Sequence, residues 1–312
     1  MNNLTVAEAL TAVENKLESI VDSEVELLGD AGRHIISSGG KRIRPHLAIL
    51  AFLATGGHPI EAVVPMAAAV EMVHTATLVH DDINDHSSTR RGKITVHEKW
   101  GKTFALLTGD YLFAKVYELM APYGTNFNVI MADACIRLVE GETLQAAAAK
   151  SGQMGRETYK RIIALKTASL FEAAARMGAM ISKASEAMVN AAADYAYNLG
   201  LAFQIVDDIL DIIGDPETLG KPVGTDVAQN RGVMATRNGG FAPVMEEVTA
   251  VAEADPIEQM MSKLRESGAV EIARLQAIEV AERARTALYK IPSSTYRDEM
   301  ESLIDLVLDR QN

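Results

Sequence analysis

Apolar residues recur every three to four positions along most of the chain, the spacing that places them on one face of an α-helix. The first such segment spans residues 4–20, where Leu10, Val13 and Leu17 share a face. We find no convincing alternation of apolar and polar residues that would predict a β-strand. The pattern predicts an all-α protein, with helices at residues 4–20, 23–37, 46–53, 61 or 65 to about 81, 102–120, 127–149, 159–180, 185–213, 243–251, 256–286 and 293–308.

Glycine-rich and polar clusters mark the breaks between these segments. Gly39-Gly40 ends the second helix, and Gly268 is where residues 256–286 would divide if they form two helices. A kink is expected near Lys166-Thr167. Residues 86–94 are expected to form a loop, as are residues 214–240, with a short helix inside the latter. Because no linker interrupts the pattern, we expect a single domain of about ten or more helices over residues 1–312.

Composition narrows the possible functions. The net charge of −12 argues against nucleic-acid binding, which needs a basic surface. No run approaches the roughly 18 consecutive apolar residues of a transmembrane segment, and the first residues show no signal-peptide pattern. The single cysteine, Cys135, cannot form an internal disulfide. A reducing, cytoplasmic setting is therefore expected.

Two acidic motifs follow apolar runs and contain the chemistry of the chain. In the first, Asp81 and Asp85 stand four residues apart, with Asp82 between them. Residues four apart on a helix share a face, and two carboxylates that close repel each other unless a cation joins them. The same pattern recurs in the second motif. The six candidate metal ligands are Asp81, Asp82, Asp85, Asp207, Asp208 and Asp211.

Basic residues complement these carboxylates. Residues 39–45 place three cations, Lys41, Arg42 and Arg44, in a glycine-led turn before a helix, which suits a phosphate. Mg²⁺ typically bridges one or two carboxylates to substrate phosphates. We therefore expect the two acidic motifs to end two helices that face each other across a cavity and to bind a diphosphate through metal ions. Further cations that could reach it are Arg90, Arg91, Lys166 and Lys221.

No other known catalytic motif competes with this interpretation. A Gly-x-Ser-x-Gly motif and a P-loop are absent from the sequence, and the histidines and the cysteine lack zinc-site spacing. His74 and His80 lie on the same predicted helix. A lone helical histidine is more often packed or hydrogen-bonded than catalytic.

In these motifs the chain resembles the trans-isoprenyl diphosphate synthases of the polyprenyl synthetase family. Residues 39–45 match the family's Gly-Gly-Lys-Arg-x-Arg-Pro motif, and residues 80–92 match its first aspartate-rich region. Residues 203–211 match the second. The resemblance covers about residues 35–235 and also includes Gly109-Asp110-Tyr111, Gly141-Glu142, Gln145, Lys166-Thr167, Gly220-Lys221, Gly224 and Asp226.

The resemblance implies an orthogonal helical bundle around a central cavity (the isoprenoid synthase fold), usually as a homodimer. It implies a cofactor, Mg²⁺, commonly three ions. It also implies a reaction in which diphosphate leaves an allylic substrate and the resulting carbocation is attacked by the double bond of isopentenyl diphosphate. A proton is then lost, and the chain grows by five carbons.

The resemblance also assigns roles to individual residues. Asp81, Asp85 and Asp207 match metal ligands, with Asp82 and Asp211 in support. Arg90, Lys166 and Lys221 match groups that bind the allylic diphosphate, and Thr167 and Gln204 match residues near the developing positive charge. The isopentenyl diphosphate site is matched by Lys41, Arg44, His74 and Arg91.

Two departures from the family pattern concern loops. Ile94 stands where the family usually has proline. The family's Gly-Lys pair, Thr, Leu and Pro after Asp226 are replaced by Asn230, Arg231, Val233, Met234 and Ala235. Arg231 keeps a positive charge with a different geometry, and we retain it as a candidate substrate-binding residue. We expect the changes after Asp226 to affect the closure of the segment near residues 220–240, and the rate of the reaction, more than the type of reaction.

Product length is expected to depend on the helix before Asp81. Ala76 stands five residues earlier, where a bulky aromatic residue in this family tends to stop growth at short products. Ala76 leaves room there, while Met72 and Val73 partly fill the space. We therefore expect a product of C20 or longer, with a short-chain farnesyl diphosphate synthase as the alternative. Alanines on a helix also simply permit close packing.

Two other functions remain to be distinguished. A terpene cyclase shares the fold and metal chemistry, but typically lacks both a second diphosphate site at Lys41 and Arg44 and a repeated acidic motif. A non-catalytic partner subunit tends to lose the acidic motifs, and this chain keeps both. Turnover by the purified chain alone distinguishes these possibilities.

Overall fold

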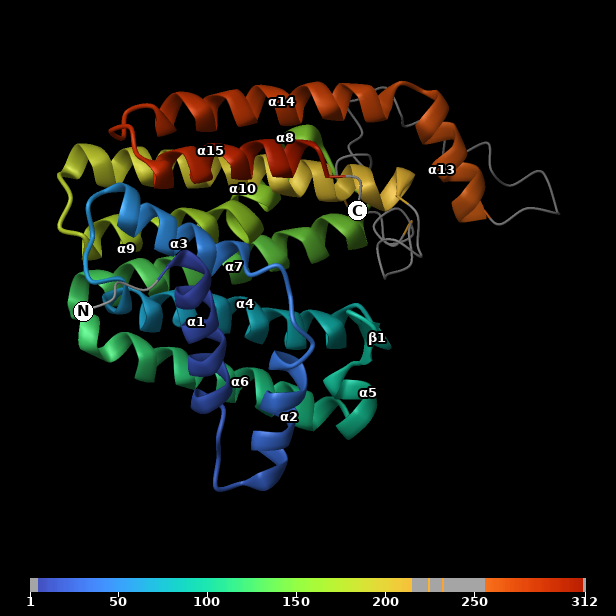
Figure 1. The fold of residues 1–312 in the computed structure, drawn as a ribbon. Coiled ribbons are helices and arrows are strands. Elements are labelled where there is room, and N and C mark those ends of the chain that lie inside the picture. Colours follow the sequence, from blue (N-terminus) through green and yellow to red (C-terminus); the bar gives the residue numbers. More distant parts are fainter. Residues whose placement is uncertain (1–4, 215–223, 225–231, 233–255, 311–312) are drawn as a thin grey trace. The chain divides into compact units, whose positions relative to one another are not determined.

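The computed structural model describes residues 5–214, 224, 232 and 256–310. Helices dominate these residues, and the strands that they contain form one short hairpin (Figure 1). The prediction of an all-α protein is confirmed. The expected loop over residues 214–240 and the expected helix over residues 243–251 lie almost wholly outside the described residues. Lys221 and Arg231 lie outside them as well.

Contacts within the chain gather in two compact units. The first contains Met1–Cys135, Ala173–Ala193 and Lys290–Met300, and the second contains Ile136–Glu172, Asp194–Tyr289 and Glu301–Asn312. The prediction of a single domain over residues 1–312 stays a prediction. The helices with residues in both units are α7 (Thr125–Ser151), α9 (Ser169–Ile181), α10 (Glu186–Ile213) and α15 (Thr295–Leu308).

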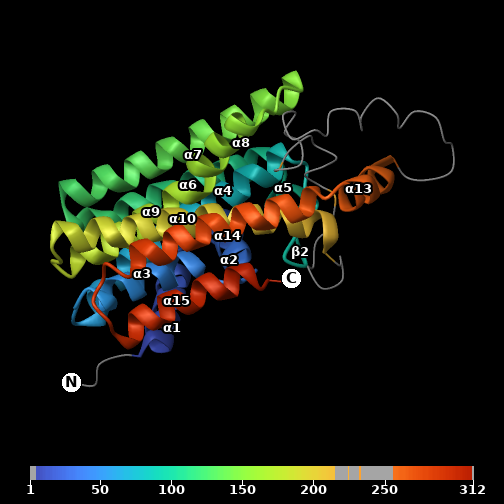
Figure 2. The ribbon, with the colours of Figure 1, turned by 90° about the horizontal axis from the view of Figure 1, so that it is seen from above.

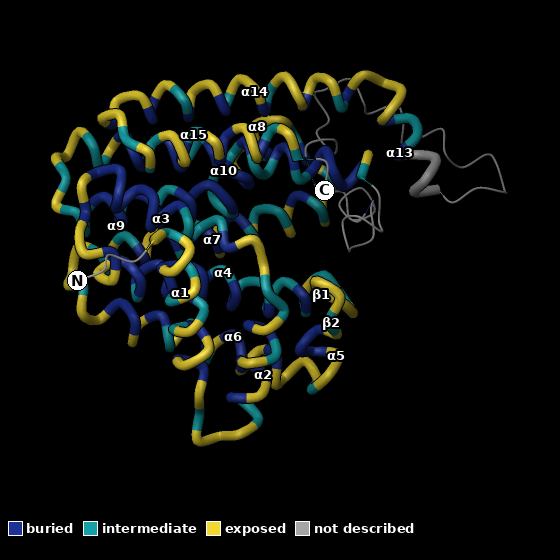
Figure 3. Tube along the Cα trace, viewed as in Figure 1, coloured by how far each residue is buried: buried dark blue, intermediate teal, exposed yellow. Residues whose placement is uncertain are grey.

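The first unit is built around helix α4 (Val64–Asn84), which packs against α1, α3 and α6. Helices α4 and α6 lie side by side in both views (Figure 1, Figure 2). Figure 3 shows that much of α4 is buried, and its buried apolar side chains include Met66, Val70 and Met72. The other helices of this unit are α1 (Val6–Ile20), α2 (Glu26–Ile36), α3 (Ile43–Ala54), α5 (Val96–Trp100) and α6 (Lys102–Met120), with single turns at Ile60–Ala62 and Ala121–Tyr123.

Burial explains why α4 is unusually apolar. By length and composition, the segment Ile60–Asn84 is the one helix in the described part of the chain that could cross a membrane. However, 72% of its most apolar window is buried, which is typical of the core helix of a folded domain. The helix starts with Pro65 in its first turn, where proline is well tolerated, and it ends within the first acidic motif.

Residues 86–94 contain a hairpin that the sequence pattern did not predict. Strand β1 (Thr89–Arg90) pairs with β2 (Lys93–Ile94) in an antiparallel register. The turn between them places Arg91 at φ 51° and Gly92 at φ 74°. Positive φ at both central residues is the geometry of a type I′ turn. Strands of two residues are too short to show alternation, so the expectation of an irregular loop was wrong here.

In the second unit, the expected kink near Lys166-Thr167 is a π-helical turn. Helix α8 (Arg156–Ile163) leads into this turn at Ala164–Ala168, and α9 follows it. Gly200 of α10 approaches the turn so closely that an added Cβ would lie 2.8 Å from Ala168 Cα. Helices α13 (Pro256–Glu266) and α14 (Ala269–Leu288) meet at Gly268, with φ 77°, so the division of residues 256–286 is confirmed.

Candidate active site

The first acidic motif forms the C-terminal end of α4. Asp85 is the C-cap residue, and its backbone N–H donates to Asp81 O at 2.8 Å. Asp81 and Asp85 are half-buried, whereas Asp82 is only 1% exposed. This arrangement agrees with the expectation that Asp81 and Asp85 share a face while Asp82 points elsewhere.

The two oxygens of the buried Asp82 carboxylate have different surroundings. Arg90 Nε donates to Asp82 Oδ1 at 2.6 Å. Asp82 Oδ2 is buried with no hydrogen-bond partner among the residues that the structure describes. Burial raises the pKa of Asp82, and the nearby Arg90 offsets part of that increase. A buried carboxylate oxygen without a donor is suited to accept a cation.

The hairpin positions both arginines of the Arg90-Arg91 pair. Arg90 projects to Asp82, whereas Arg91 Nη1 donates to the backbone oxygen of Gly39. Gly40 has φ 149°, a conformation that favours glycine, and a Cβ there would lie 2.5 Å from Arg91 Nη1, so the guanidinium would have to shift. Burial lowers the pKa of Arg91. The glycine-led turn and the hairpin, about fifty residues apart in sequence, therefore meet in the first unit.

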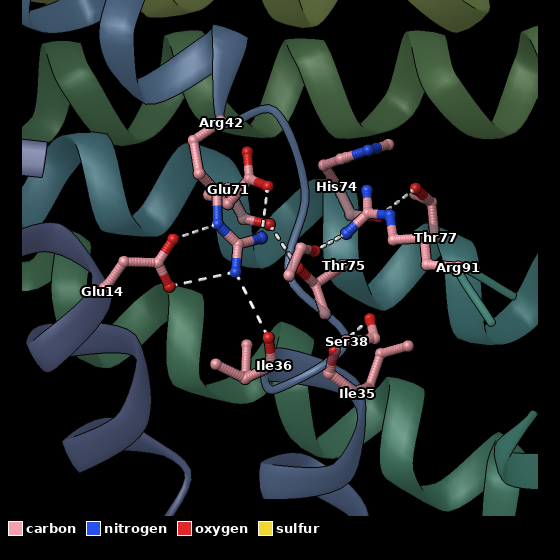
Figure 4. Close-up of polar contacts among 11 residues, drawn as sticks. Glu14, Ile35, Ile36, Ser38, Arg42, Glu71, His74, Thr75, Thr77 and Arg91 are labelled. Atoms are coloured by element: carbon pink, nitrogen blue, oxygen red, sulfur yellow. Dashed lines mark hydrogen bonds and ion pairs between the residues drawn. The ribbon is translucent and has the colours of Figure 1, made fainter. Parts of the chain in front are cut away.

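His74 lies beside this cluster of cations. Burial lowers the pKa of His74 well below its usual value of 6.5, and the neighbouring Arg44, Arg91, Arg90 and Arg42 lower it further. The imidazole is therefore neutral at pH 7. A neutral imidazole among several guanidinium groups forms a locally cationic environment that suits an anion. Figure 4 shows His74 beside Arg91.

The three cations of the glycine-led turn differ in how far they are buried. Lys41 is exposed, Arg44 is half-buried and Arg42 is 9% exposed. Arg42 points away from its two neighbours, toward carboxylates on α1 and α4. Charge and spacing did not distinguish it from Lys41 and Arg44, because its partners are distant in the chain; only the family resemblance set those two apart as substrate-binding residues.

The second acidic motif lies near the C-terminal end of α10, in the second unit. Asp208 is 4% exposed and accepts two hydrogen bonds, from Tyr159 Oη at 2.7 Å and from Gln204 Nε2 at 2.8 Å. Asp207 is half-buried, and Arg310 Nη2 lies 3.7 Å from its Oδ1. Asp211 is 1% exposed. Both oxygens of Asp208 thus have hydrogen-bond donors.

A chain of hydrogen bonds joins the π-helical turn to this motif. Thr167 Oγ1 donates to Gln204 Oε1 at 2.7 Å, and the Gln204 amide donates onward to Asp208. This network fixes the orientation of the Gln204 amide. The structure therefore brings Thr167 and Gln204 together, as expected for two residues that act at one reaction centre. π-Helical turns are frequent at functional sites.

The neighbouring Lys166 forms an ion pair with Glu142 of α7. A Cβ on Gly141 would lie 2.7 Å from Lys166 N. The Gly141-Glu142 pair therefore lets α7 approach the π-helical turn and places a carboxylate against the lysine. Lys166 is a half-buried cation with a fixed position rather than a surface lysine.

The three candidate chain-length residues are fully buried. Met72, Val73 and Ala76 of α4 are each 0% exposed, as are Ala68 and Ala69. Burial is required of residues that would line a hydrocarbon tunnel, but it is equally expected of residues packed in a core. Their effect on product length stays a prediction.

Sequence reasoning missed several residues that the geometry adds. Tyr159, Glu71 and Arg310 contact candidate site residues or their neighbours, but none belongs to a motif that we singled out. Glu71 is a charged residue at a position where the apolar spacing of α4 predicts a buried side chain. That mismatch between charge and pattern was the available signal. Tyr159 and Arg310 gave no local signal, since their partners lie far away in the sequence.

Comparisons with known proteins agree with the resemblance in these motifs. A family model described as polyprenyl synthetase matches residues 25–235. A short chain isoprenyl diphosphate synthase of Methanothermobacter thermautotrophicus is 35% identical over 96% of both chains. Octaprenyl diphosphate synthase of Escherichia coli is 33% identical over 99% of this chain and 98% of its own.

Solved structures show the same similarity. Heptaprenyl diphosphate synthase from Staphylococcus aureus has a TM-score of 0.92 at 30% identity, with complete coverage of both chains. A polyprenyl synthase from Caulobacter crescentus, complexed with calcium and isoprenyl diphosphate, has a TM-score of 0.91 at 33% identity, also with complete coverage. The chain thus has the isoprenoid synthase fold of these proteins.

Proposed function

The chain belongs to the polyprenyl synthetase family and is a trans-prenyltransferase that acts on isoprenyl diphosphates, and we propose that its two acidic motifs bind the metal ions that this reaction needs. Family members generally depend on Mg²⁺. Mg²⁺ takes oxygen ligands and usually retains water and phosphate oxygens in its coordination shell. Among the described residues, no three acidic, histidine or cysteine side chains cluster as a metal site.

The buried Asp82 oxygen is the observation that supports this proposal most strongly. Asp82 Oδ2 has no donor in the part of the chain that the structure describes, while Arg90 holds Oδ1. We assign Asp81, Asp82 and Asp85 as ligands in the first unit, and Asp207 and Asp211 in the second. Asp208 is better suited to positioning Gln204, because both its oxygens already accept hydrogen bonds. Three ions are the expected number.

The cationic residues divide between the two substrates. We propose that Lys41, Arg44, His74 and Arg91 bind isopentenyl diphosphate. The lowered pKa of His74 leaves it neutral, so its ring can donate one hydrogen bond without adding charge. Arg90 and Lys166 would bind the allylic diphosphate, together with Lys221 and Arg231 from outside the described residues.

These groups act on the bond that breaks. Separation of diphosphate from the allylic carbon leaves negative charge on the leaving group and positive charge on the hydrocarbon. Bound Mg²⁺ supplies Lewis-acid stabilisation of the leaving diphosphate, and Arg90 and Lys166 add fixed positive charge. The double bond of isopentenyl diphosphate then forms the new carbon–carbon bond, and loss of a proton restores neutrality.

We propose that Thr167 and Gln204 act near the carbocation. Thr167 donates its hydroxyl proton to Gln204 Oε1, so the remaining lone pairs of its oxygen are available to a nearby positive charge. The Gln204 amide is fixed in turn by Asp208. The Thr167 hydroxyl and the Gln204 amide donate to these acceptors, so their hydrogens do not point at the carbocation. A donor that pointed at the carbocation would destabilise it.

The product is proposed to be C20 or longer. Ala76, fully buried on α4, provides less bulk than an aromatic residue at the same position. Relatives of similar identity bear names from short chain to octaprenyl synthases, so overall similarity does not decide product length. A farnesyl diphosphate synthase is the alternative product class.

We also propose a cytoplasmic homodimer. Helix α6 exposes four large apolar side chains, Phe104, Leu106, Leu107 and Tyr117. Exposed apolar groups gathered on one element are typical of a protein–protein interface. Light scattering of the purified protein coupled to gel filtration tests this, and a monomeric mass at micromolar concentration would exclude a stable homodimer.

One assay tests the function. The purified chain is incubated with Mg²⁺, isopentenyl diphosphate and, in turn, dimethylallyl, geranyl, farnesyl or geranylgeranyl diphosphate, and products are analysed by mass spectrometry. A series of products differing by five carbons is expected. Cyclised hydrocarbon without consumption of isopentenyl diphosphate would indicate a terpene cyclase. Turnover only after addition of a second protein would indicate a partner subunit.

A further inference from the structure

Arg42 is the buried member of the glycine-led turn, and two carboxylates bind it. Its Nη1 donates to Glu71 Oε1 at 2.8 Å, and its Nη2 donates to Glu14 Oε2 at 3.0 Å (Figure 4). Its Nε also donates to Glu14. Glu14 lies on α1 and Glu71 on α4. A single guanidinium therefore joins two helices to the turn that precedes α3.

This network is an unusual arrangement for stability alone. Glu71 is 2% exposed, and its Oε2 finds no hydrogen-bond partner within the described ranges. Removing charges from water is costly, and well-packed apolar residues often give equal or greater stability. Arg42 also has φ 48°, a left-handed conformation that is unfavourable for a residue with a Cβ. Such costs are typical of residues kept for a functional geometry.

The geometry fixes the residues on either side of Arg42. Arg42 is the N-cap residue of α3 and has a left-handed backbone. The chain therefore changes direction sharply at Arg42, between Lys41 and Arg44. Arg42 Nη2 also donates to Ile36 O at 3.3 Å, which closes the loop after α2. On the other side, Arg91 donates to Gly39. The turn is therefore held at both ends.

The same network sets the turn against His74. Glu71 and His74 are three residues apart on α4, so they lie on neighbouring positions of one helix face. The Thr75 hydroxyl donates to Glu71 O at 2.8 Å, one turn along the same helix. Binding of Arg42 to Glu71 thus fixes the distance between the turn and the part of α4 that carries His74.

We propose that Arg42, through Glu14 and Glu71, is a positioning residue that places Lys41 and Arg44 for isopentenyl diphosphate without touching that substrate. The proposal rests on the assignment of Lys41, Arg44, His74 and Arg91 to that substrate under the proposed function. It predicts a selective effect: losing the network weakens binding of isopentenyl diphosphate and leaves binding of the allylic substrate nearly unchanged.

The test compares kinetic constants for both substrates in variants of Arg42. Arg42→Gln is expected to raise KM for isopentenyl diphosphate by about 10- to 100-fold, the loss associated with one or two charge-assisted hydrogen bonds. KM for the allylic diphosphate should change by less than about twofold, because the hydrogen bonds of Arg42 go to Glu14, Glu71 and Ile36 and not to residues assigned to that substrate. Arg42→Lys keeps the charge but lacks the planar guanidinium, so its KM for isopentenyl diphosphate should lie between those of the wild type and Arg42→Gln.

A double variant separates position from stability. Arg42→Met with Glu71→Met removes both buried charges together, which should return the melting temperature close to that of the wild type. If positioning is the role of Arg42, KM for isopentenyl diphosphate stays raised in this stable protein. Recovery of that constant along with stability would overturn the proposal. The double variant also keeps the test valid if Arg42→Gln fails to fold.

Two controls identify which part of the argument fails. Arg33 also binds two carboxylates, Asp22 and Asp30, but is exposed on α2, and Arg33→Gln should leave both Michaelis constants unchanged. Lys41→Ala tests the substrate assignment directly. If Lys41→Ala raises KM for isopentenyl diphosphate while Arg42→Gln does not, the positioning role is wrong. If neither variant raises it, the proposed substrate site itself is wrong.

Discussion

Arg90 and Asp82 form a buried ion pair in which the Arg90 Nε and Asp82 Oδ1 atoms lie 2.6 Å apart. The carboxylate is 1% exposed, whereas the arginine is 28% exposed. Arg90 therefore holds one carboxylate oxygen while part of its side chain stays exposed. Through this pair, Arg90, a proposed diphosphate-binding residue, contacts Asp82, a proposed metal ligand.

Asp82→Asn should lower kcat/KM for the allylic substrate by about 10- to 100-fold, the loss expected for a charged hydrogen bond of about 1.5–3 kcal/mol. The amide keeps the size of the side chain but loses the charge that attracts both Arg90 and a cation. Steady-state kinetics at saturating and limiting Mg²⁺ measures the effect. Asp22→Asn, at an exposed carboxylate that also pairs with an arginine, is the matched control. Equal activity of the two variants would contradict the role of Asp82.

His74 should make stability depend on pH. Its pKa in the folded protein lies well below the usual 6.5, because of burial and four nearby arginines. The unfolded chain therefore binds more protons near pH 6, so the free energy of unfolding falls as the pH drops below about 6.5. One proton contributes at most about 1.4 kcal/mol per pH unit.

His74→Gln should therefore flatten this dependence. Urea unfolding at pH 5.5, 6.5 and 7.5 measures the free energy of unfolding, and the variant should lose less stability than the wild type between pH 6.5 and 5.5. His58→Gln, at an exposed position, should behave like the wild type. An identical slope for His74→Gln would show that the histidine does not remain neutral in the folded protein.

Most of the helices followed from the apolar spacing, because burial of one face dictates that spacing directly. The long helix α4 and the junction at Gly268 were predicted, as was a kink at Lys166-Thr167. The hairpin at Arg91-Gly92 was missed, because its two-residue strands leave no periodic signal. Gly92 was the available turn signal in the sequence, and the structure shows that both Arg91 and Gly92 adopt positive φ.

The candidate site divides in the same way. Residues in contiguous motifs, such as Asp82 and Arg90, were found from sequence because local spacing brings them together. The family resemblance separated Lys41 and Arg44 from Arg42, but the role of Arg42 emerged only from its burial and its carboxylate partners. Tyr159 could not be found at all, since its contact with Asp208 depends on tertiary packing. Sequence identifies the charged groups, but packing decides which of them are already neutralised by a neighbour.

Tyr159→Phe should weaken the second acidic motif without altering its charge. The phenol donates to Asp208 Oδ2 at 2.7 Å in a buried position, and removing it leaves a carboxylate oxygen without that donor. The cost should be about 1–3 kcal/mol in stability, with a lower melting temperature and a reduced kcat because Gln204 loses a fixed partner. Calorimetry and single-turnover kinetics measure the two effects. Tyr296→Phe, at a half-buried tyrosine of α15, should change neither, and a wild-type kcat in Tyr159→Phe would argue against a role for the network in catalysis.

Removing Mg²⁺ should abolish turnover and substrate-induced stabilisation together. With excess chelator we expect no measurable product, and activity should return when Mg²⁺ is restored. A non-reactive diphosphate analogue should raise the melting temperature only when Mg²⁺ is present, since ligand binding stabilises the folded state in proportion to occupancy. Asp81→Ala should lose both responses. Full activity after chelation would refute the metal-dependent mechanism, and an analogue shift without Mg²⁺ would show that the arginines and lysines bind diphosphate unaided.

Product length offers a test that depends on shape rather than charge. Ala76 is 0% exposed on α4, five residues before Asp81. A phenylalanine there adds a ring to space that is either the wall of a hydrocarbon tunnel or ordinary core. In the first case the ring blocks chain growth, and in the second it causes only overpacking, which typically costs about 1–3 kcal/mol.

Ala76→Phe is therefore expected to shift the products toward C15, as measured by mass spectrometry with each allylic primer, while kcat for the first condensation stays within about tenfold of the wild type. Ala9→Phe controls for overpacking, because Ala9 is a fully buried alanine on α1. It should lower the melting temperature without shortening the product. If both variants lose stability and neither changes the product distribution, α4 is a core helix at Ala76, and product length is set elsewhere in the protein.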